Sequence, residues 1–394
     1  MDARAVTRLR VLNCIRERGE ASRTDIAAAL RLSPATVTFV TSGLMSGGLI
    51  EEVAASESDN SKRGRPRVAL RMAQARFHVA GIKITRKDMS ILILDWDGTE
   101  VAHSNLELSA SPMDPMTLVK TIARAVEDTC KDIEGGTDSV AGLSIGLAGQ
   151  IDWSTRYVHW SSSLTERNVD FGSLLEEHLP YPAFVDNDAN LAAKAEQLFG
   201  EAKGLENFLV VTVEHGVGLG IVLDGRLYRG QRGCGAEFGH TKVAINGALC
   251  QCGQRGCLEA YVGGYAILRE AEEKLGQKNI TAVKDVVDAA DAGDPAAQSI
   301  LDQTGEFFAM GLANLINLFD PERIVLTGAK HRIAHLCSDD VLGRVARNVV
   351  NVDAPLPDIR VHHYSDKMWA RGAAAMGIDQ VSALKVQELG KNAT

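Results

Sequence analysis

One histidine and three cysteines lie close together in the middle of the chain, within "GHTKVAINGALCQCGQRGCLEA", residues 239–260. Imidazole nitrogens and thiolates are the preferred protein ligands of Zn²⁺, and one nitrogen with three sulfurs suits its tetrahedral geometry. Because four protein ligands leave no open coordination position, the spacing predicts one structural Zn²⁺ per chain rather than a hydrolytic metal. The alternative is four unrelated buried residues, which the short spacing disfavours. The predicted ligands are His240, Cys250, Cys252 and Cys257.

The composition is that of an ordinary globular protein. The chain has 394 residues, of which 45% are hydrophobic and 24% charged, enough for two or three domains. The sequence contains no run of 18 or more apolar residues, so no membrane span is expected. The segment "MDARAVTRLR" has no apolar signal core, so we expect a cytoplasmic protein. Seven cysteines do not make a secreted disulfide framework. Those outside the cluster (Cys14, Cys130, Cys234 and Cys337) are interpreted as small core hydrophobes.

Charge separates the first part of the chain from the rest. Residues 1–72 carry 12 Arg and Lys against 8 Asp and Glu, a net charge of +4, whereas the whole chain carries −9. A basic head on an acidic body is typical of a nucleic-acid-binding module attached to another domain. A solvated basic surface would produce the same numbers, so charge alone does not decide between the two.

Three helices are predicted in the head, near residues 6–19, 22–32 and 33–50. Ser22 and Ser33 are the expected N-caps, and Pro34 takes the first helical position of the third helix. Short helices with small polar residues at the start of the third indicate a helix-turn-helix that offers Ser33, Thr36 and Thr38 to the major groove. The alternative is a plain three-helix bundle. The expected inward positions are Val6, Leu9, Leu12, Ile15, Ile26, Leu30, Val37, Val40 and Leu44.

A hairpin with a basic return strand follows in "EEVAASESDNSKRGRPRVALRM", residues 51–72. Arg63, Arg65 and Arg67 stand beside Gly and Pro, where they could reach a narrow minor groove. Such a run could instead be a basic linker. Helices and hairpin together predict a DNA-binding domain over residues 1–75, which resembles the winged helix-turn-helix of many bacterial repressors.

The body, residues 76–394, alternates strands and helices in two similar sets. The first opens with strands in "FHVAGIKI", "MSILILDWDG" and "EVAHSNLELS", and the second begins near residue 207 with "NFLVVTV" and "LGIVLDGRLYRG". Each set starts with antiparallel hairpins and ends in helices. The predicted fold class is therefore α/β, a winged helix-turn-helix followed by a two-lobed actin-like or sugar-kinase (ribonuclease H-like) ATPase fold, whose ligands bind between the lobes.

Four segments resemble blocks of the ROK family of repressors, open reading frames and sugar kinases. They are "EFGH" with "CQCGQRGCLE", "FVDNDANLAAKAEQLFG", "GVGLGIVLDGRLYRG" and "NLFDPERIVLTG". The resemblance covers nearly the whole chain, and the winged helix is typical of the family's transcriptional regulators. It implies that the free ring nitrogen of His240 faces a sugar.

The resemblance implies further sugar contacts in Glu237 and Glu259, and in Asn187 and Asp188 from the other lobe. Asp188 matches the general base of the kinases. Where the family often has an asparagine, this chain has Ser163, so sugar selectivity is expected to differ.

Catalysis is not expected, because the nucleotide loops depart from the kinase pattern. An Asp-x-Gly-Gly-Thr loop is replaced by Lys83 with Thr85, Arg86 and Lys87, and a Gly-Thr-Gly loop by Glu214, His215 and Gly216. "TGAK" stands in place of a glycine run. Bulky and acidic side chains keep phosphate away from backbone N–H groups, so ATP binding is not expected and Asp188 is a vestigial base.

These observations together predict a sugar-responsive regulator, most simply a repressor, of carbohydrate uptake or catabolism genes. We expect a homodimer or higher oligomer on palindromic operator DNA, with a sugar or sugar phosphate as effector. One alternative is an active or bifunctional ROK sugar kinase. The other is a regulator switched by a protein partner such as a sugar-transport component.

Overall fold

The computed structural model describes residues 2–54, 68–73, 77–276, 280–328, 330–350, 355–363 and 366–391. The chain divides into two compact units. The first contains residues 1–145, 171–184 and 373–394, and the second contains residues 146–170 and 185–372. No helix among the described residues is long and apolar enough to cross a membrane.

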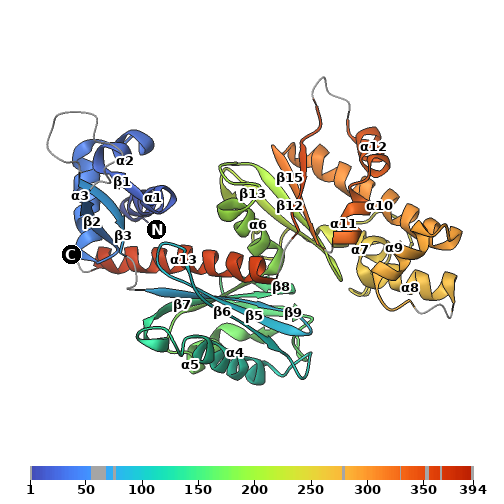
Figure 1. The fold of residues 1–394 in the computed structure, drawn as a ribbon, viewed down its shortest axis with the longest axis horizontal. Helices are drawn as coiled ribbons and strands as arrows, with labels where there is room; N and C mark the ends of the chain where they lie inside the picture. The colour runs from blue at the N-terminus through green and yellow to red at the C-terminus, as the bar shows by residue number, and fades with distance from the viewer. Residues whose placement is uncertain are drawn as a thin grey trace. The chain divides into compact units, whose positions relative to one another are not determined.

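The head of the first unit is a winged helix (Figure 1). Its three strands form an antiparallel sheet in the order β1-β3-β2. Ser22 and Ser33 are the N-caps of the second and third helices, as predicted, and Pro34 begins the third. The predicted arginines Arg63, Arg65 and Arg67 lie outside the described residues. The elements are α1 (Ala3–Arg18), β1 (Glu20–Ser22), α2 (Arg23–Leu30), α3 (Pro34–Ser46), β2 (Ile50–Ala54) and β3 (Val68–Met72).

Most of the predicted inward positions of the head are confirmed. The buried ones are Leu12, Ile15, Ile26, Val37, Val40 and Leu44, while Leu9 and Leu30 are half-buried. The prediction that Val6 faces inward is wrong, because Val6 is 37% exposed and Ala5 is buried in its place. A run of i,i+3 spacings drifts off one face of a helix with 3.6 residues per turn, so the first member of the run falls outside the stripe.

The body contains two five-stranded sheets with the same strand order. In each, the first strand of the sheet lies in the middle, its second and third strands extend to one side, and the fourth and fifth to the other. The orders are β6-β5-β4-β7-β11 and β14-β13-β12-β15-β16. This repetition confirms the predicted duplicated α/β architecture.

In the first unit, β4 is buried along its whole length. Its sheet strands are β4 (His78–Ile84), β5 (Asp88–Leu94), β6 (Glu100–Glu107), β7 (Val140–Leu147) and β11 (Ala183–Asn187), with η2 (Gly136–Ser139) before β7. Residues 146–147 of β7 and 185–187 of β11 are counted with the second unit. The accompanying helices are α4 (Pro115–Thr129), α5 (Phe171–His178) and α13 (Asp366–Lys391), of which the residues from 373 onward belong to this unit.

In the second unit, β12 pairs antiparallel with β13 and parallel with β15. Its strands are β8 (Gly149–Asp152), β9 (Tyr157–Ser161), β10 (Val169–Asp170), β12 (Phe208–Val213), β13 (Val217–Leu223), β14 (Arg226–Leu227), β15 (Arg323–Gly328) and β16 (Asp358–Val361). Its helices are α6 (Asp188–Phe199), η3 (Phe238–His240), α7 (Glu259–Val262), α8 (Gly264–Leu275), α9 (Val283–Asp291), α10 (Pro295–Phe319), α11 (Lys330–Leu336) and α12 (Asp339–Asn348).

The winged helix is fastened to the rest of the first unit by Trp96, in the turn between β5 and β6. The Trp96 side chain is fully buried, and its indole N–H donates to the Leu49 carbonyl at 3.2 Å. The Arg16 guanidinium lies 5.3 Å from the centre of the Trp96 ring and donates to Ser382 Oγ of α13 at 2.9 Å. Figure 1 shows the C-terminal part of α13 (red) beside the head. The head is therefore packed against the rest of the first unit.

Candidate metal centre and acidic cluster

The four predicted metal ligands come together from a short 3-10 helix and a tight loop of the second unit. His240 ends η3, and Cys257 lies two residues before α7. Between them, the Cys250 N–H donates to the Gln254 carbonyl at 2.8 Å and closes the turn that carries Cys252. A Cβ atom on Gly256 would lie 1.7 Å from the Ala244 carbonyl oxygen, so this position admits only glycine.

The ligand atoms are spaced for one small cation. All four lie within 4.8 Å of one another. Cys250 Sγ is 3.7 Å from His240 Nδ1, and Cys252 Sγ is 3.8 Å from Cys257 Sγ. Zinc bound tetrahedrally at the usual bond lengths requires ligand separations of about 3.5–3.8 Å. The donor set and its spacing therefore fit Zn²⁺, and these four residues could hold it.

Polar groups from outside the cluster surround the sulfurs. Lys242 Nζ lies 2.9 Å from Cys257 Sγ, and the Tyr265 hydroxyl lies 3.4 Å from Cys250 Sγ. Burial raises the pKa of the Cys257 thiol to about 11. Without a cation the thiol therefore keeps its proton at neutral pH, and metal binding would release that proton.

The second ring nitrogen of His240 faces an acidic cluster. His240 Nε2 lies 3.8 Å from Glu237 Oε2. Burial raises the pKa of Glu237 above its ordinary value, the neighbouring His240 lowers it, and the nearby carboxylates of Glu259 and Asp188 raise it. These four side chains are thus within electrostatic reach of one another. Glu259 is held by the Val217 N–H, which donates to Oε2 at 3.1 Å.

Asn187 and Asp188 stand at the start of α6. The Asn187 side chain accepts from the Ala189 N–H at 2.8 Å and donates to the Gly149 carbonyl at 2.7 Å. Both residues are half-buried. Asn187 is the last residue of β11, an edge strand of the sheet that contains β4, and Asp188 begins α6. Both belong to the same compact unit as Glu237, His240 and Glu259. Because β11 crosses the division between the units, its last residues cluster with the helix that they cap.

A buried ion pair that the sequence did not reveal positions this segment. Asp186, 3% exposed, accepts from the Asn187 N–H at 2.8 Å and from the Asn190 amide at 2.7 Å. Its other oxygen accepts from Arg229 at 2.8 Å, and the Arg229 guanidinium lies 4.7 Å from the centre of the Trp153 ring. The sequence shows Asp186 within the polar segment "VDNDAN", but it does not show that Asp186 pairs with Arg229, 43 positions away.

Replacing Arg229 by methionine should loosen Asn187, because the change leaves the buried Asp186 carboxylate without its cation. We expect the free energy of unfolding to fall by about 3 kcal/mol, and the backbone amide of Asn187 to exchange hydrogen faster. Arg226→Met, at an exposed position nearby, is the control. Unchanged exchange at Asn187 would remove Arg229 from the support of this site.

Ser163 differs from the other candidate residues in having no visible partner. Its side chain is 2% exposed, and within the described part of the chain its hydroxyl makes no hydrogen bond. The preceding strand is connected to Asn187, since Ser161 pairs with Gly149, whose carbonyl accepts from the Asn187 amide. A buried hydroxyl costs free energy until it finds a partner.

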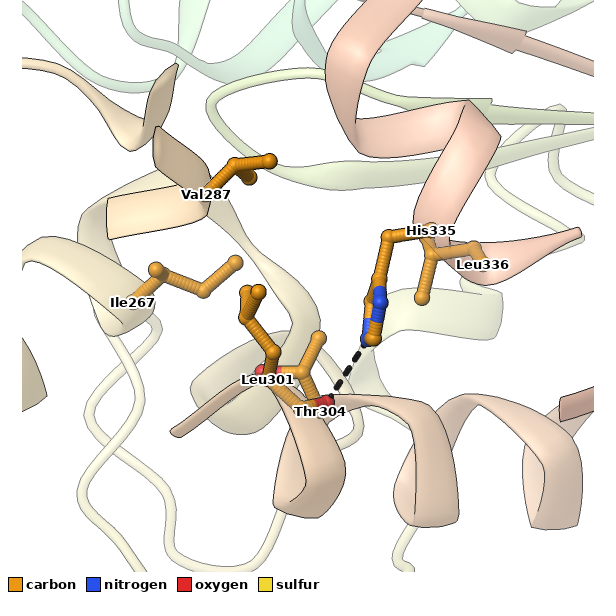
Figure 2. Close-up of a pocket in the computed structure, with 6 residues that line it drawn as sticks. All are labelled: Ile267, Val287, Leu301, Thr304, His335 and Leu336. Atoms are coloured by element: carbon orange, nitrogen blue, oxygen red, sulfur yellow. Dashed lines mark hydrogen bonds between the residues drawn. The ribbon is translucent and has the colours of Figure 1, made fainter. Parts of the chain in front are cut away.

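A small pocket elsewhere in the second unit does not contain these residues (Figure 2). Its two polar side chains are already bonded within the protein, since His335 Nε2 donates to the Leu301 carbonyl at 2.9 Å and Thr304 Oγ1 to the Ile300 carbonyl at 2.9 Å. The pocket therefore offers little to a polar ligand. Its lining residues are Ile267, Val287, Leu301, Thr304, His335 and Leu336.

The segments expected to depart from nucleotide-binding loops have their own internal hydrogen bonds. Lys83 is buried in β4. In the turn that follows, Thr85 Oγ1 accepts from the N–H groups of Lys87 and Asp88, both at 3.0 Å. In the second unit, the Glu214 N–H donates to the Gly216 carbonyl at 2.9 Å. Thr327 and Gly328 end β15, and Ala329 lies outside the described residues.

The predicted DNA-contacting residues of the head lie on α3 and its N-cap. Ser33 and Thr38 are exposed and Thr36 is half-buried. Ser33 Oγ accepts from the Thr36 N–H at 3.1 Å, as its capping role requires. These three hydroxyl residues thus share the N-terminal part of one helix, on the solvent side.

Comparisons with known proteins match both parts of the chain. Residues 79–380 match the model of the ROK family, and residues 6–60 match that of the MarR family. The chain is 29% identical over 325 residues to the N-acetylglucosamine repressor of Escherichia coli O6:H1. The aligned region covers 81% of this chain and 79% of that repressor.

Two solved structures differ in how much of the chain they match. A ROK family transcriptional regulator, a homolog of the E. coli MLC protein, has 25% identity and a TM-score of 0.80 over 98% of this chain and 99% of its own. A ROK family glucokinase from Streptomyces griseus, solved with glucose and AMPPNP, has 26% identity and a TM-score of 0.64 over 76% of this chain and 99% of its own.

Proposed function

This chain belongs to the ROK family, and from that premise we propose that it is a sugar-responsive transcriptional repressor. The observation that carries the proposal is the extent of the match. A solved ROK regulator covers 98% of the chain, winged helix included, whereas a solved ROK glucokinase covers 76%. A sugar kinase needs no winged helix, so the presence of the winged helix indicates that the chain binds DNA. We infer a DNA-binding domain over residues 1–75 and an effector domain over residues 76–394, and the family matches over residues 6–60 and 79–380 support this division.

The cluster of His240 and three cysteines holds one structural Zn²⁺ per chain in this proposal. Zinc bound there would fix the loop between η3 and α7 and leave no open position for chemistry. His240 Nδ1 faces the sulfurs and Nε2 faces Glu237. With Nδ1 bound to zinc, His240 would keep Nε2 as a hydrogen-bond donor toward the acidic cluster.

The acidic cluster is the sugar site of this proposal. Carboxylates suit sugars because each can accept hydrogen bonds from two adjacent hydroxyls. It is supported by the 3.8 Å approach of His240 Nε2 to Glu237 Oε2, and by the charges of Asp188 and Glu259, which raise the pKa of Glu237. Ser163 contributes to selectivity, because a buried hydroxyl is smaller than the asparagine usual in the family. The proposed contacts are Asn187, Asp188, Glu237, His240 and Glu259.

Phosphorylation of the sugar is not part of this function. Phosphoryl transfer depends on positioning and neutralising a nucleotide, chiefly through backbone N–H groups and a metal ion. In the first of the altered loops, the hydroxyl of Thr85 already accepts from two N–H groups of its turn. In the second altered loop, Glu214 adds a negative charge that would repel a nucleotide phosphate. Asp188 then serves only as a hydrogen-bond partner. An active kinase is the second candidate, supported by the retained aspartate.

Sugar binding weakens DNA binding in this scheme. A ligand shifts a conformational equilibrium only by its difference in affinity for the two states, so the sugar must bind the DNA-free form more tightly. The active species is a homodimer whose two heads read a palindromic operator.

Replacing Asp188 by asparagine should reduce the sugar response and leave DNA binding in the absence of sugar unchanged. Loss of one charged hydrogen bond lowers affinity about tenfold or more. We would measure binding of glucose and N-acetylglucosamine by calorimetry, and DNA binding by fluorescence anisotropy with and without each sugar. Asp291→Asn, an exposed position on α9, is the control. Turnover of either sugar with ATP, lost in the Asp188 variant, would establish the kinase instead.

A further inference from the structure

The exposed face of α3 carries one large aromatic side chain. Phe39 is 67% exposed, whereas Val37 and Val40 on either side of it are buried in the head. Phe39 lies in the second turn of the helix, six residues after the N-cap Ser33. In a helix-turn-helix, residues of the N-terminal half of this helix reach the base edges of the major groove.

The residues that usually read bases are missing from this helix. Its sequence, PATVTFVTSGLMS, contains no Arg, Lys, Asn, Gln, Asp or Glu. Bidentate recognition of guanine needs Arg or Lys, that of adenine needs Asn or Gln, and cytosine is read by an acidic side chain. The helix can therefore read bases only through hydroxyls and apolar groups.

Most hydroxyls at the start of α3 already have hydrogen bonds within the helix. Ser33 Oγ lies 2.8 Å from Thr36 Oγ1 and accepts from the Thr36 N–H. Thr38 Oγ1 donates to the Pro34 carbonyl at 2.9 Å. The Phe39 ring is thus the largest group on this face that is exposed to solvent.

We propose that Phe39 contacts the 5-methyl group of a thymine in the major groove and makes that methyl a determinant of the operator. This rests on the proposed function, in which the head binds DNA. A phenyl ring and a thymine methyl exclude water from each other, and this apolar contact distinguishes thymine from the other bases. Helix α3 has no basic residue to attract DNA phosphates, but residues 1–72 carry a net charge of +4, which supplies that attraction.

The test begins with selection of binding sites from a random duplex library by the full-length chain. In the recovered site, each thymine is then replaced singly by deoxyuridine, which removes only the methyl group. Wild type should lose about fourfold in affinity for one thymine per half-site, the factor for one buried methyl group. Placing 5-methylcytosine there should cost less than placing cytosine.

Phe39→Ala should bind the selected site more weakly and show no loss on the same deoxyuridine replacement. Phe39→Leu should keep part of the sensitivity, and Ser46→Ala, exposed at the other end of α3, should keep all of it. Because Phe39 is exposed, an unchanged melting temperature will show that the alanine variant is folded.

Two failures can be told apart. A selected site that tolerates deoxyuridine at every thymine, or that loses affinity equally in wild type and Phe39→Ala, overturns the reading of the methyl group and leaves DNA binding in place. A library from which the full-length chain enriches no sequence overturns the proposed function and this inference with it.

Discussion

Replacing Cys257 by serine should remove zinc from the purified protein and abolish its response to sugar. The side chain is fully buried among the other three ligands, and a serine hydroxyl is a poor zinc ligand. A structural zinc contributes on the order of 10 kcal/mol of apparent binding free energy, so this is the largest effect that we expect of any single substitution. The loop between η3 and α7 should become mobile, and His240 should lose its orientation toward Glu237.

The matched control is Cys234→Ser, which changes a half-buried cysteine outside the cluster. Metal analysis should find about one zinc per chain in wild type and in this control, and almost none in Cys257→Ser. Thermal unfolding followed by circular dichroism reports the loss of stability. If Cys257→Ser keeps its zinc, or loses it and still responds to sugar, the metal has no part in the sugar site.

Replacing Trp96 by alanine should lower the free energy of unfolding of the first unit by about 3–5 kcal/mol, the usual range for a buried tryptophan. The change removes the indole N–H that binds the Leu49 carbonyl, the surface under Arg16, and the edge-to-face contact with Phe77 at 5.6 Å. The winged helix would then be tethered but no longer packed. Its DNA affinity should survive in part, because its own core is intact, while the effect of sugar on that affinity should disappear.

Trp96→Phe separates packing from hydrogen bonding, since it keeps most of the ring surface and loses the N–H. We expect it to cost about 1 kcal/mol and to retain most of the sugar response. Urea denaturation gives the stability, and anisotropy with labelled DNA gives the response. A full sugar response in a folded Trp96→Ala protein would show that the head does not need this contact to be regulated.

Features set by neighbouring residues could be predicted from the sequence. The capping of α3 by Ser33 depends on a hydroxyl and an N–H three residues apart, and the four candidate metal ligands lie within one short segment. Hydrophobic alternation and repetition likewise indicated two α/β sets, which the matching strand orders confirm.

Features that depend on distant partners could not be predicted. Arg16 is an ordinary basic residue in the sequence, yet its partners Trp96 and Ser382 lie 80 and 366 positions away. The pairing of Asp186 with Arg229 is of the same kind. Local patterns of polarity show which residues can form such bonds, but only the fold determines which ones meet. The error at Val6 has another origin, since four apolar residues at equal spacing define a face only approximately.

The central claim is that sugar bound at the acidic cluster controls DNA binding without being phosphorylated. The most direct test is a titration of the full-length chain, bound to a labelled duplex from the selection, with glucose and with N-acetylglucosamine in the absence of ATP, followed by recovery of the sugar after incubation with ATP and Mg²⁺. We predict that one of them releases the DNA without ATP and is recovered unphosphorylated. Sugar phosphate among the products, or DNA binding that neither sugar changes, would contradict the account.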